Sequence, residues 1–187
     1  MAPNYYEHII SEFETDPQLG IAGGAVYTKV GRKLVTCDQT VDSVGGAVQL
    51  FRRECFEQLG GYMRLECGGI DAAAEIQARM NGWKVRKFPA NIVFEQRRTG
   101  SASRTFLTCK YNEGLRFHSL GYSTLFYICR TVYRVRDKPL FFGSSVALFG
   151  FLHAKFKRYP LCLPPRVVSY LRREQITKLK RKILRHG

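Results

Sequence analysis

Helical and extended patterns alternate along residues 1–96, and this alternation restricts the chain to a small set of folds. A helix is predicted from near Pro3 to the Asp-Pro pair at residues 16–17, because apolar residues recur there at helical spacing and the Asp-Pro pair should end it. Residues 19–30 are predicted to form a strand, and residues 31–37 to pair with it as a hairpin. Alternation of this kind favours an α/β sheet domain.

The rest of this region continues the alternation. The Gly-Gly pair at residues 23–24 predicts a bulge or a close backbone approach within the first strand. Residues 45–50 are predicted as a strand that leads into a short helix at residues 54–59. A second helix is predicted over residues 70–81, with an apolar stripe on one side. Residues 83–96 should then form an exposed strand followed by a buried one.

The charge of the chain is concentrated after residue 95. Residues 1–95 hold ten Lys and Arg and twelve Asp and Glu, a net charge of −2. Residues 96–187 hold twenty basic and three acidic residues, a net charge of +17. The second half therefore requires an acidic partner or an anionic surface.

The same half contains two mostly apolar segments, at residues 115–139 and 140–160. The uninterrupted apolar stretch in each is too short to span a bilayer, and Lys and Arg residues follow it. A basic helix is predicted for the tail at residues 167–187. Such helices suit a membrane interface. We therefore expect an α/β domain at residues 1–96 and a basic, helical, membrane-associating tail at residues 97–187.

The overall composition excludes several classes of protein. A chain of 187 residues that is 45% hydrophobic and 13% aromatic has enough apolar side chains for a folded core. Its six cysteines are scattered without a C-x-x-C pair, which predicts free thiols in a reducing compartment instead of a disulfide framework or a zinc site. The opening residues, MAPNYYEHII, do not form a secretory signal.

Asp71 is the candidate catalytic residue. It stands at the start of the predicted helix after Gly68 and Gly69, and it has two compatible interpretations. The first is a helix cap, although a capping box would place Glu or Gln at the position of Ala74. The second is a general base held rigidly beside glycines that allow a substrate to approach.

The order of three motifs gives this residue a context. The segment GGAVQLFRREC at residues 45–55 is followed by the Asp-led helix IDAAAEIQARMNGWKVRKFP at residues 70–89, and then by RRTGSA at residues 97–102. This order resembles the C-terminal half of family 2 glycosyltransferases, the inverting GT-A type enzymes that build bacterial surface and capsular polysaccharides of the cell envelope. The resemblance runs from about Tyr5 to the end of the chain.

The resemblance implies roles for individual residues. Asp71 would be the general base that removes the acceptor hydroxyl proton while the hydroxyl attacks a nucleotide-sugar. Gly45, Gly46 and Ala47 would form the floor near the sugar, and Gly69 would allow the substrate to approach. The last two predicted substrate-binding residues, which would face the diphosphate, are Arg97 and Arg98.

This sequence departs from the family pattern in several places. The family often has Glu-Asp where this chain has Ile70 and Asp71, and often has His where Glu95 and Gln96 stand. The resemblance also implies an upstream nucleotide-binding half with an Asp-x-Asp motif for diphosphate and a divalent metal, Mg or Mn. Since Met1 and Ala2 stand where that motif would be, the metal ligands are expected mainly outside this chain. We expect the chain to be inactive alone, as a fragment or as one half of a split enzyme.

The resemblance and the charge pattern together predict the partners. These are a nucleotide-sugar donor, a saccharide or lipid-linked acceptor, and the anionic inner face of the plasma membrane, with the protein itself cytoplasmic. A donor-binding chain or further copies of this chain are the protein partners that fit. The alternatives are a non-catalytic subunit of a split glycosyltransferase and a nucleic-acid-binding protein, although no nucleic-acid-binding motif occurs.

Three further residues have less specific interpretations. Trp83 ends the apolar stripe of the predicted helix and is interpreted as a core residue, with a sugar platform as the alternative. His118 and His153 lie within apolar segments and are interpreted as interfacial residues without a catalytic role.

Overall fold

The computed structural model describes residues 3–30, 33–36, 41–66, 68–95, 105–135 and 141–184. These form two compact units. The first consists of residues 1–64 and 70–99, and the second of residues 65–69 and 100–187. The boundary that the sequence predicts, after residue 96, falls in a segment outside the described residues.

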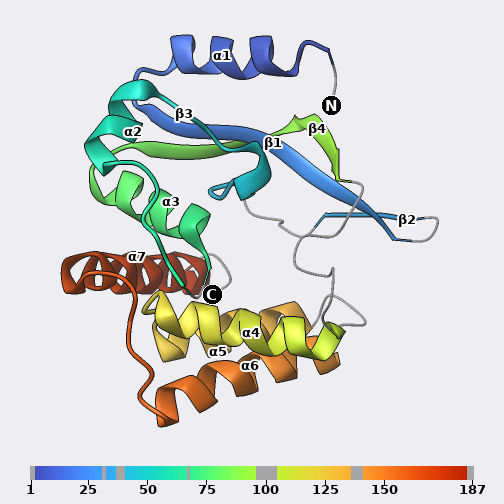
Figure 1. The fold of residues 1–187 in the computed structure, drawn as a ribbon, viewed down its shortest axis with the longest axis vertical. Coiled ribbons are helices and arrows are strands. Elements are labelled where there is room, and N and C mark those ends of the chain that lie inside the picture. The colour runs from blue at the N-terminus through green and yellow to red at the C-terminus, as the bar shows by residue number, and fades with distance from the viewer. Residues whose placement is uncertain are drawn as a thin grey trace. The chain divides into compact units, whose positions relative to one another are not determined.

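A mixed sheet of four strands forms the centre of the first unit (Figure 1). Strand β1 (Leu19–Val30) pairs antiparallel with β2 (Lys33–Thr36) and with β3 (Leu50–Phe51). On its other edge it pairs parallel with β4 (Lys84–Glu95). The predicted hairpin of the first two strands is thus confirmed.

The Gly-Gly pair of β1 marks the predicted irregularity. The register between β1 and β4 shifts after Gly24, so that residues 89–91 of β4 bulge away from the ladder. A Cβ atom on Gly24 would lie 1.9 Å from the carbonyl oxygen of Asn91. The Gly24 N–H donates a hydrogen bond to the hydroxyl oxygen of Tyr5 (2.8 Å). The close backbone approach is therefore confirmed, whereas the bulge lies in β4 and not in the first strand.

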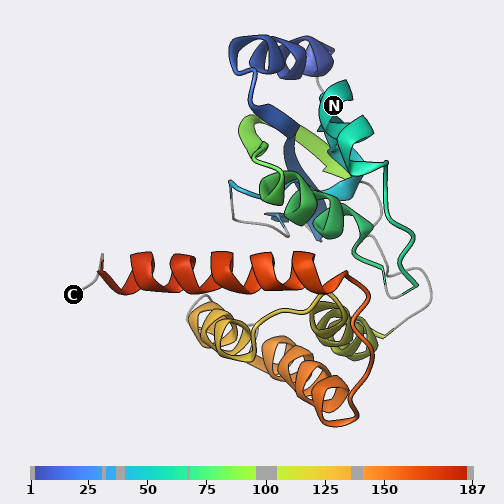
Figure 2. The ribbon, with the colours of Figure 1, turned by 90° about the vertical axis from the view of Figure 1, so that its left-hand side faces the viewer.

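Helices cover both faces of the sheet (Figures 1 and 2). Helix α1 (Tyr5–Thr15) begins and ends close to where its sequence predicts, and its buried residues pack on Leu19 and Ala22. Helices α2 (Arg53–Leu59) and α3 (Ile70–Met80) contribute to a second core cluster. The members of that cluster are Ile21, Val44, Val48, Cys55, Ala78 and Val85.

Trp83 belongs to this second cluster. Its ring is partly buried against the core residues, and its Nε1–H donates a hydrogen bond to Oε1 of Gln58 (2.6 Å). The core interpretation of Trp83 is confirmed.

Two predictions about the strands are wrong. Residues 46–48, predicted as part of a strand, form a 3₁₀ turn, η1 (Gly46–Val48), because the Val48 N–H bonds back to the Gly45 carbonyl (2.9 Å). The two strands predicted after residue 82 form a single bulged strand, β4. In the first part of β4, Val85 packs into the core. The second part is not buried as predicted, since its side chains are alternately exposed and partly buried and Phe94 is 56% exposed.

The second unit contains four helices within the described residues: α4 (Phe106–Ser119), α5 (Thr124–Val135), α6 (Phe141–Phe156) and α7 (Pro165–Leu184). Figure 2 shows α7 running along one side of the unit, next to α5. The predicted tail helix is confirmed by α7, which buries Val168 and Leu171. No helix in the described part of the chain combines the length and the apolarity needed to cross a membrane.

The histidines of this unit lie in different surroundings. His118, at the end of α4, is only 9% exposed and packs its ring edge-on against Phe151 (5.8 Å between centroids). The interfacial interpretation of His118 is therefore wrong, since α4 and α6 enclose the ring. His153 is half-buried, and its Nδ1 lies 2.7 Å from the hydroxyl oxygen of Tyr111.

Candidate active site around Asp71

Asp71 lies beside the exposed glycine turn of the first unit. Helix α3 begins at Ile70, which places Asp71 within the first helical turn and not at the preceding cap position. A Cβ atom on Gly46 would lie 3.1 Å from both Cβ and Oδ2 of Asp71. The carboxylate therefore lies directly against a piece of backbone that carries no side chain.

The surroundings of this carboxylate are open on the glycine side. Gly46 and Ala47 are exposed, and Asp71 itself is partly buried. The N-terminal end of α3, which carries a partial positive charge, lies beside this carboxylate. A partly exposed, negatively charged oxygen next to bare backbone can accept a proton from a bound hydroxyl group.

Gln49 connects the glycine turn to α3. Its Nε2 donates to the Val44 carbonyl (3.1 Å), to Oε1 of Glu75 (3.1 Å) and, more weakly, to the Asp71 carbonyl (3.4 Å). Its Oε1 accepts a hydrogen bond from the hydroxyl of Tyr62 (2.8 Å). One amide group thus fixes the turn, the helix and the phenol relative to one another.

Glu75 lies one helical turn after Asp71 and is almost completely buried, with 3% exposure. Its Oε1 accepts the Val44 N–H (2.6 Å) and a longer bond from the Ser43 hydroxyl (3.4 Å), while its Oε2 lies 3.7 Å from Nη1 of Arg79. Burial raises the pKa of Glu75 to about 7, although these donors and the arginine act in the opposite direction. The residue is therefore close to its titration point near neutral pH.

Tyr62 completes the group. Burial, and after it the negative charges of Asp71 and Glu75, raise the pKa of its phenol. Its ring makes edge-on contacts with Phe51 and Phe56, with centroid distances of 5.4 and 6.2 Å. The phenol is thus a neutral hydrogen-bonding group near the two carboxylates at physiological pH.

The predicted site residues are only partly brought together. Gly46 touches Asp71, whereas a Cβ on Gly45 would meet only Cγ2 of Val26, at an ordinary 3.5 Å. Gly69 belongs to the second unit, where its Cα faces the aliphatic parts of Arg116 and Leu120. Ala47 is exposed in the turn that follows Gly46.

Arg97 and Arg98 lie outside the described residues, so their predicted contact with a diphosphate remains a prediction.

Sequence reasoning missed three members of the group. Glu75 is recognisable in the sequence only as a helical neighbour of Arg79, and that pair does exist at 3.7 Å. The available signal was its position within a run of small apolar residues, where a carboxyl group is expected to be buried. Gln49 and Tyr62 gave no comparable signal, because their contacts join residues 13 to 26 positions apart.

The described residues contain no group of three or more His, Cys, Asp or Glu side chains that could hold a metal ion. Among the described residues, the carboxylates of this group are those of Asp71 and Glu75. The chemistry that these groups can supply is proton transfer and hydrogen bonding.

The chain has a structural likeness to a solved protein at low sequence identity. No model of a known protein family matches the chain, and no curated protein matches it. Among solved structures, it is similar to mannosyltransferase PcManGT from Pyrobaculum calidifontis in complex with GDP-Man and Mn²⁺, with 13% sequence identity and a TM-score of 0.45. The aligned region covers 88% of this chain and 48% of that one, so the chain spans about half of that protein's length.

Proposed function

We propose that this chain supplies the acceptor side of an inverting glycosyltransferase, with Asp71 as the general base. The observation that carries the proposal is the contact between the Asp71 carboxylate and the bare, exposed backbone of Gly46. The order of the three sequence motifs supports it independently. The product would be a glycosidic bond in a surface polysaccharide or on a lipid-linked saccharide.

The proposed reaction is a direct displacement. The acceptor hydroxyl donates a hydrogen bond to the Asp71 carboxylate and transfers its proton there as its oxygen attacks the anomeric carbon. The bond between that carbon and the diphosphate oxygen breaks, and the nucleoside diphosphate leaves with the electron pair. Attack from the side opposite to the leaving group inverts the anomeric configuration.

The surrounding residues would position the base. Gln49 holds the glycine turn against α3, so that Gly46 stays beside Asp71. Glu75 anchors the same turn through the Val44 N–H. These residues act through Asp71 and its turn and need not touch the substrate.

The remaining parts of such an enzyme are proposed to lie outside the described residues. A donor-binding half would hold the nucleotide and a divalent ion, and Arg97 and Arg98 would neutralise the departing diphosphate. The ion would stabilise the charge of the leaving group when bound.

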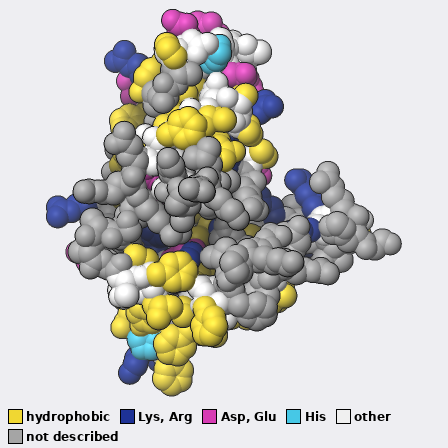
Figure 3. All heavy atoms as spheres, turned by 90° about the vertical axis from the view of Figure 1, so that its right-hand side faces the viewer, with side chains coloured by type: hydrophobic (Ala, Val, Ile, Leu, Met, Phe, Trp, Pro, Cys, Tyr) yellow, Lys and Arg dark blue, Asp and Glu magenta, His cyan; other side chains and the backbone are white. Residues whose placement is uncertain are grey.

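Exposed aromatic residues support a second part of the proposal, which is attachment to an anionic membrane surface on the cytoplasmic side. Phe142, Phe149 and Phe156 of α6 are 79%, 63% and 84% exposed. They are spaced seven residues apart, so they lie along one line of the helix. Figure 3 shows hydrophobic side chains gathered in its lower part, over the helices of the second unit.

The net charge of +17 in residues 96–187 would add electrostatic attraction to anionic lipids. The attachment is tested by sedimentation of the full chain with vesicles that contain anionic lipid, at physiological salt. A chain that stays in the supernatant contradicts the attachment.

The catalytic proposal is tested by release of the nucleoside diphosphate when the full chain is combined with a donor-binding chain from its genomic neighbourhood and a saccharide acceptor. Asp71→Asn should lower the rate by at least about a hundredfold, because the proton acceptor is lost. Donor binding, measured separately, should not change.

The matched control for this test is Glu54→Gln, which neutralises an exposed acid in the first turn of α2 and should leave the rate unchanged. Equal rates for Asp71→Asn and the unaltered chain would reduce Asp71 to a residue that stabilises its helix. Absence of transfer in every mixture, with the chain still required for polysaccharide synthesis in cells, would favour the non-catalytic subunit.

A further inference from the structure

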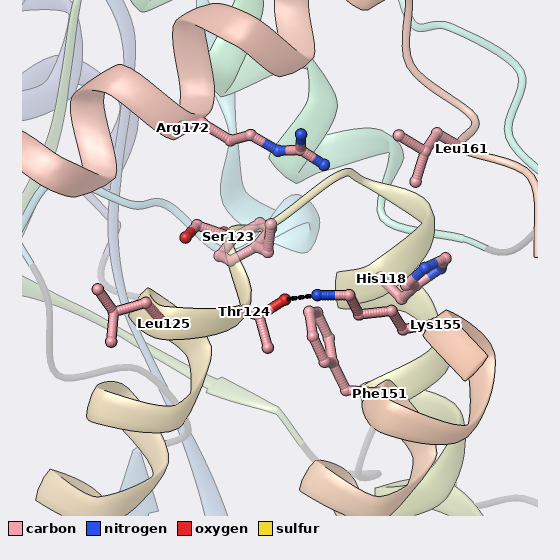
Figure 4. A pocket seen from close by; sticks show the side chains of 9 residues that line it. His118, Ser123, Thr124, Leu125, Phe151, Lys155, Leu161 and Arg172 are labelled. Carbon is pink, nitrogen blue, oxygen red and sulfur yellow. Dashed lines mark hydrogen bonds between the residues drawn. The ribbon is translucent and has the colours of Figure 1, made fainter. Parts of the chain in front are cut away.

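The second unit contains a pocket of about 400 Å³ between its helices. It is lined by His118 at the end of α4, by the turn that leads into α5, and by side chains of α6 and α7 (Figure 4). This volume falls in the range of small-molecule sites, for which about 300 to 1,000 Å³ is usual. None of the described residues that line the pocket is acidic.

Two cationic side chains line the pocket from different helices. Nζ of Lys155 donates to Oγ1 of Thr124 (2.6 Å), and Nε of Arg172 donates to the Gly121 carbonyl (3.0 Å). These bonds hold both groups in place while Arg172 keeps the N–H groups of its two terminal nitrogens, which can form paired bonds to phosphate oxygens. Figure 4 shows Lys155 and Arg172 on two sides of the same space.

His118 lines the pocket as a third residue that can carry a positive charge. The side chain is 9% exposed, and its Nδ1 is buried without a hydrogen-bond partner among the described residues. An unpaired buried polar atom is costly, and in folded proteins such atoms usually have a partner. Burial, and then the charges of Lys155 and Arg172, lower the pKa of this imidazole. The negative charge of a bound anion would oppose the effects of Lys155 and Arg172 on this pKa. The imidazole could then take up a proton and donate a hydrogen bond.

The start of α5 adds a fourth contribution. This helix of 12 residues begins at Thr124, which lines the pocket, and the N-terminal end of a helix carries a partial positive charge. The Ser123 N–H that precedes it is already bonded to Oε1 of Gln175 (2.9 Å), which fixes the position of the turn. The pocket is therefore positive on several sides.

We propose that this pocket binds the phosphoryl group of a phosphate monoester or diphosphate. Arg172, Lys155 and His118 would hold the phosphoryl oxygens. A phosphate group fills only part of about 400 Å³, so the rest of the pocket accommodates the esterified group, against Leu125 and Leu161. The proposal rests on the second unit alone and is independent of the role of Asp71.

The first experiment titrates the full chain with inorganic phosphate and with phenyl phosphate, at an ionic strength held constant with chloride, and follows the imidazole signals of His118 by NMR. Phenyl phosphate should bind more tightly than inorganic phosphate, because its ring contacts the apolar wall. Both should raise the pH at which His118 titrates by about one unit or more. No change at His118 with either ligand would overturn the proposal.

Matched variants distinguish a site from general attraction to a basic surface. Arg172→Gln and Lys155→Gln should each weaken phenyl phosphate binding about tenfold or more. Arg173→Gln, an exposed neighbour on the same helix, should change it less than about twofold. Equal losses in Arg173→Gln and Arg172→Gln would overturn the proposal. If Arg172→Gln lowers the thermal stability through its lost bond to Gly121, the exposed Lys155 still provides the test.

Vesicles then separate two sources of the phosphoryl group. Phosphatidate carries a phosphate monoester and phosphatidylglycerol a diester, so vesicles of equal surface charge can be compared. Preference for phosphatidate that is lost in Lys155→Gln assigns the pocket to a lipid headgroup. Phenyl phosphate binding without that preference assigns it to a soluble phosphate ester.

Discussion

At the scale of single residues, two adjacent glycines differ in what a side chain would meet. A Cβ on Gly46 would be 3.1 Å from the Asp71 side chain, whereas a Cβ on Gly45 would have only Cγ2 of Val26 at 3.5 Å. We predict that Gly46→Ala displaces the carboxylate and lowers glycosyl transfer about tenfold or more, with a loss of stability of about 1 kcal/mol.

The matched variant is Gly45→Ala. Gly45 has φ of −61° and ψ of 136°, a conformation that alanine adopts readily. This change should preserve activity and raise the free energy of unfolding slightly, by about 0.5 kcal/mol, because it restricts the unfolded chain. Transfer rates and denaturant unfolding of both variants check the pair, and equal activity in the two would argue against a substrate site at Gly46.

The burial of Glu75 predicts that the free energy of unfolding depends on pH. The folded state keeps its proton up to a pKa of about 7, whereas the unfolded chain loses it near the usual 4.5. The contribution of Glu75 to the free energy of unfolding is therefore fully present below pH 4.5 and decreases as the pH rises to about 7. The decrease is on the order of 3 kcal/mol, since each pH unit between two pKa values corresponds to about 1.4 kcal/mol.

The measurement for Glu75 compares urea unfolding of the chain and of Glu75→Gln at pH 5 and pH 8. The variant keeps an oxygen to accept the Val44 N–H but cannot ionise, so its stability relative to the unaltered chain should increase between the two pH values. A difference that is the same at both values would show that Glu75 ionises normally in the folded protein.

These residues also show how far sequence reasoning extends. Asp71 was identified as a candidate base, because the acid, the two glycines before it and the start of the helix are local features of the sequence. Its contact with Gly46 was not predicted, because the two residues are distant in the chain. The network of Gln49, Glu75 and Tyr62 was not, because each hydrogen bond in it joins residues distant in the chain. Local patterns identify a candidate base, whereas the groups that hold it depend on the tertiary fold.

At the scale of elements, α4 and α6 pack with their backbones in close contact. A Cβ on Gly114 would lie 1.9 Å from the Ala147 carbonyl oxygen, and a Cβ on Gly150 would lie 2.3 Å from the Tyr111 carbonyl oxygen. The sequence predicted the apolar segment that forms α6, but most of α4 lies in residues 97–114, which the sequence predicts to be a polar, basic loop. The mutual packing of the two helices was not predicted either. Small residues on facing helices are recognisable as a contact only when the pairing of the helices is known.

This packing predicts the effect of a single methyl group. Gly114→Ala should lower the free energy of unfolding by about 2 to 3 kcal/mol, because the rigid backbone of α6 must move and the gain in helix propensity offsets only about 1 kcal/mol. Gly143→Ala is the control, since its Cβ would meet the far end of the Phe106 ring at 3.0 Å, which can rotate away. Thermal unfolding of both variants measures the difference, and equal stability would contradict the close contact.

At the scale of the whole molecule, the two units differ in composition as well as in fold. The α/β unit was predicted from alternating patterns, and the helical unit from its apolar and basic segments. The division at residues 65–69, which places a short piece of the chain before α3 with the helical unit, has no signal in the sequence. It depends on contacts such as that of Gly69 with Arg116, which no local pattern encodes.

The exposed line of phenylalanines on α6 predicts how strongly the chain binds to membranes. If the chain attaches to membranes through this line, Phe142→Ser, Phe149→Ser and Phe156→Ser together should weaken its partitioning to anionic vesicles by at least about a hundredfold, at about 1 to 2 kcal/mol for each ring. Raising the salt concentration should weaken the residual binding further, because the basic residues then act alone.

The control for this variant is Phe94→Ser, which removes a ring with 56% exposure from β4 of the other unit. It should leave vesicle binding unchanged, because the attachment is assigned to the helical unit. Sedimentation with vesicles at two salt concentrations distinguishes the possibilities. Equal binding of the triple variant and the unaltered chain would mean that charge alone accounts for attachment. The line of phenylalanines would then be available for contact with a protein.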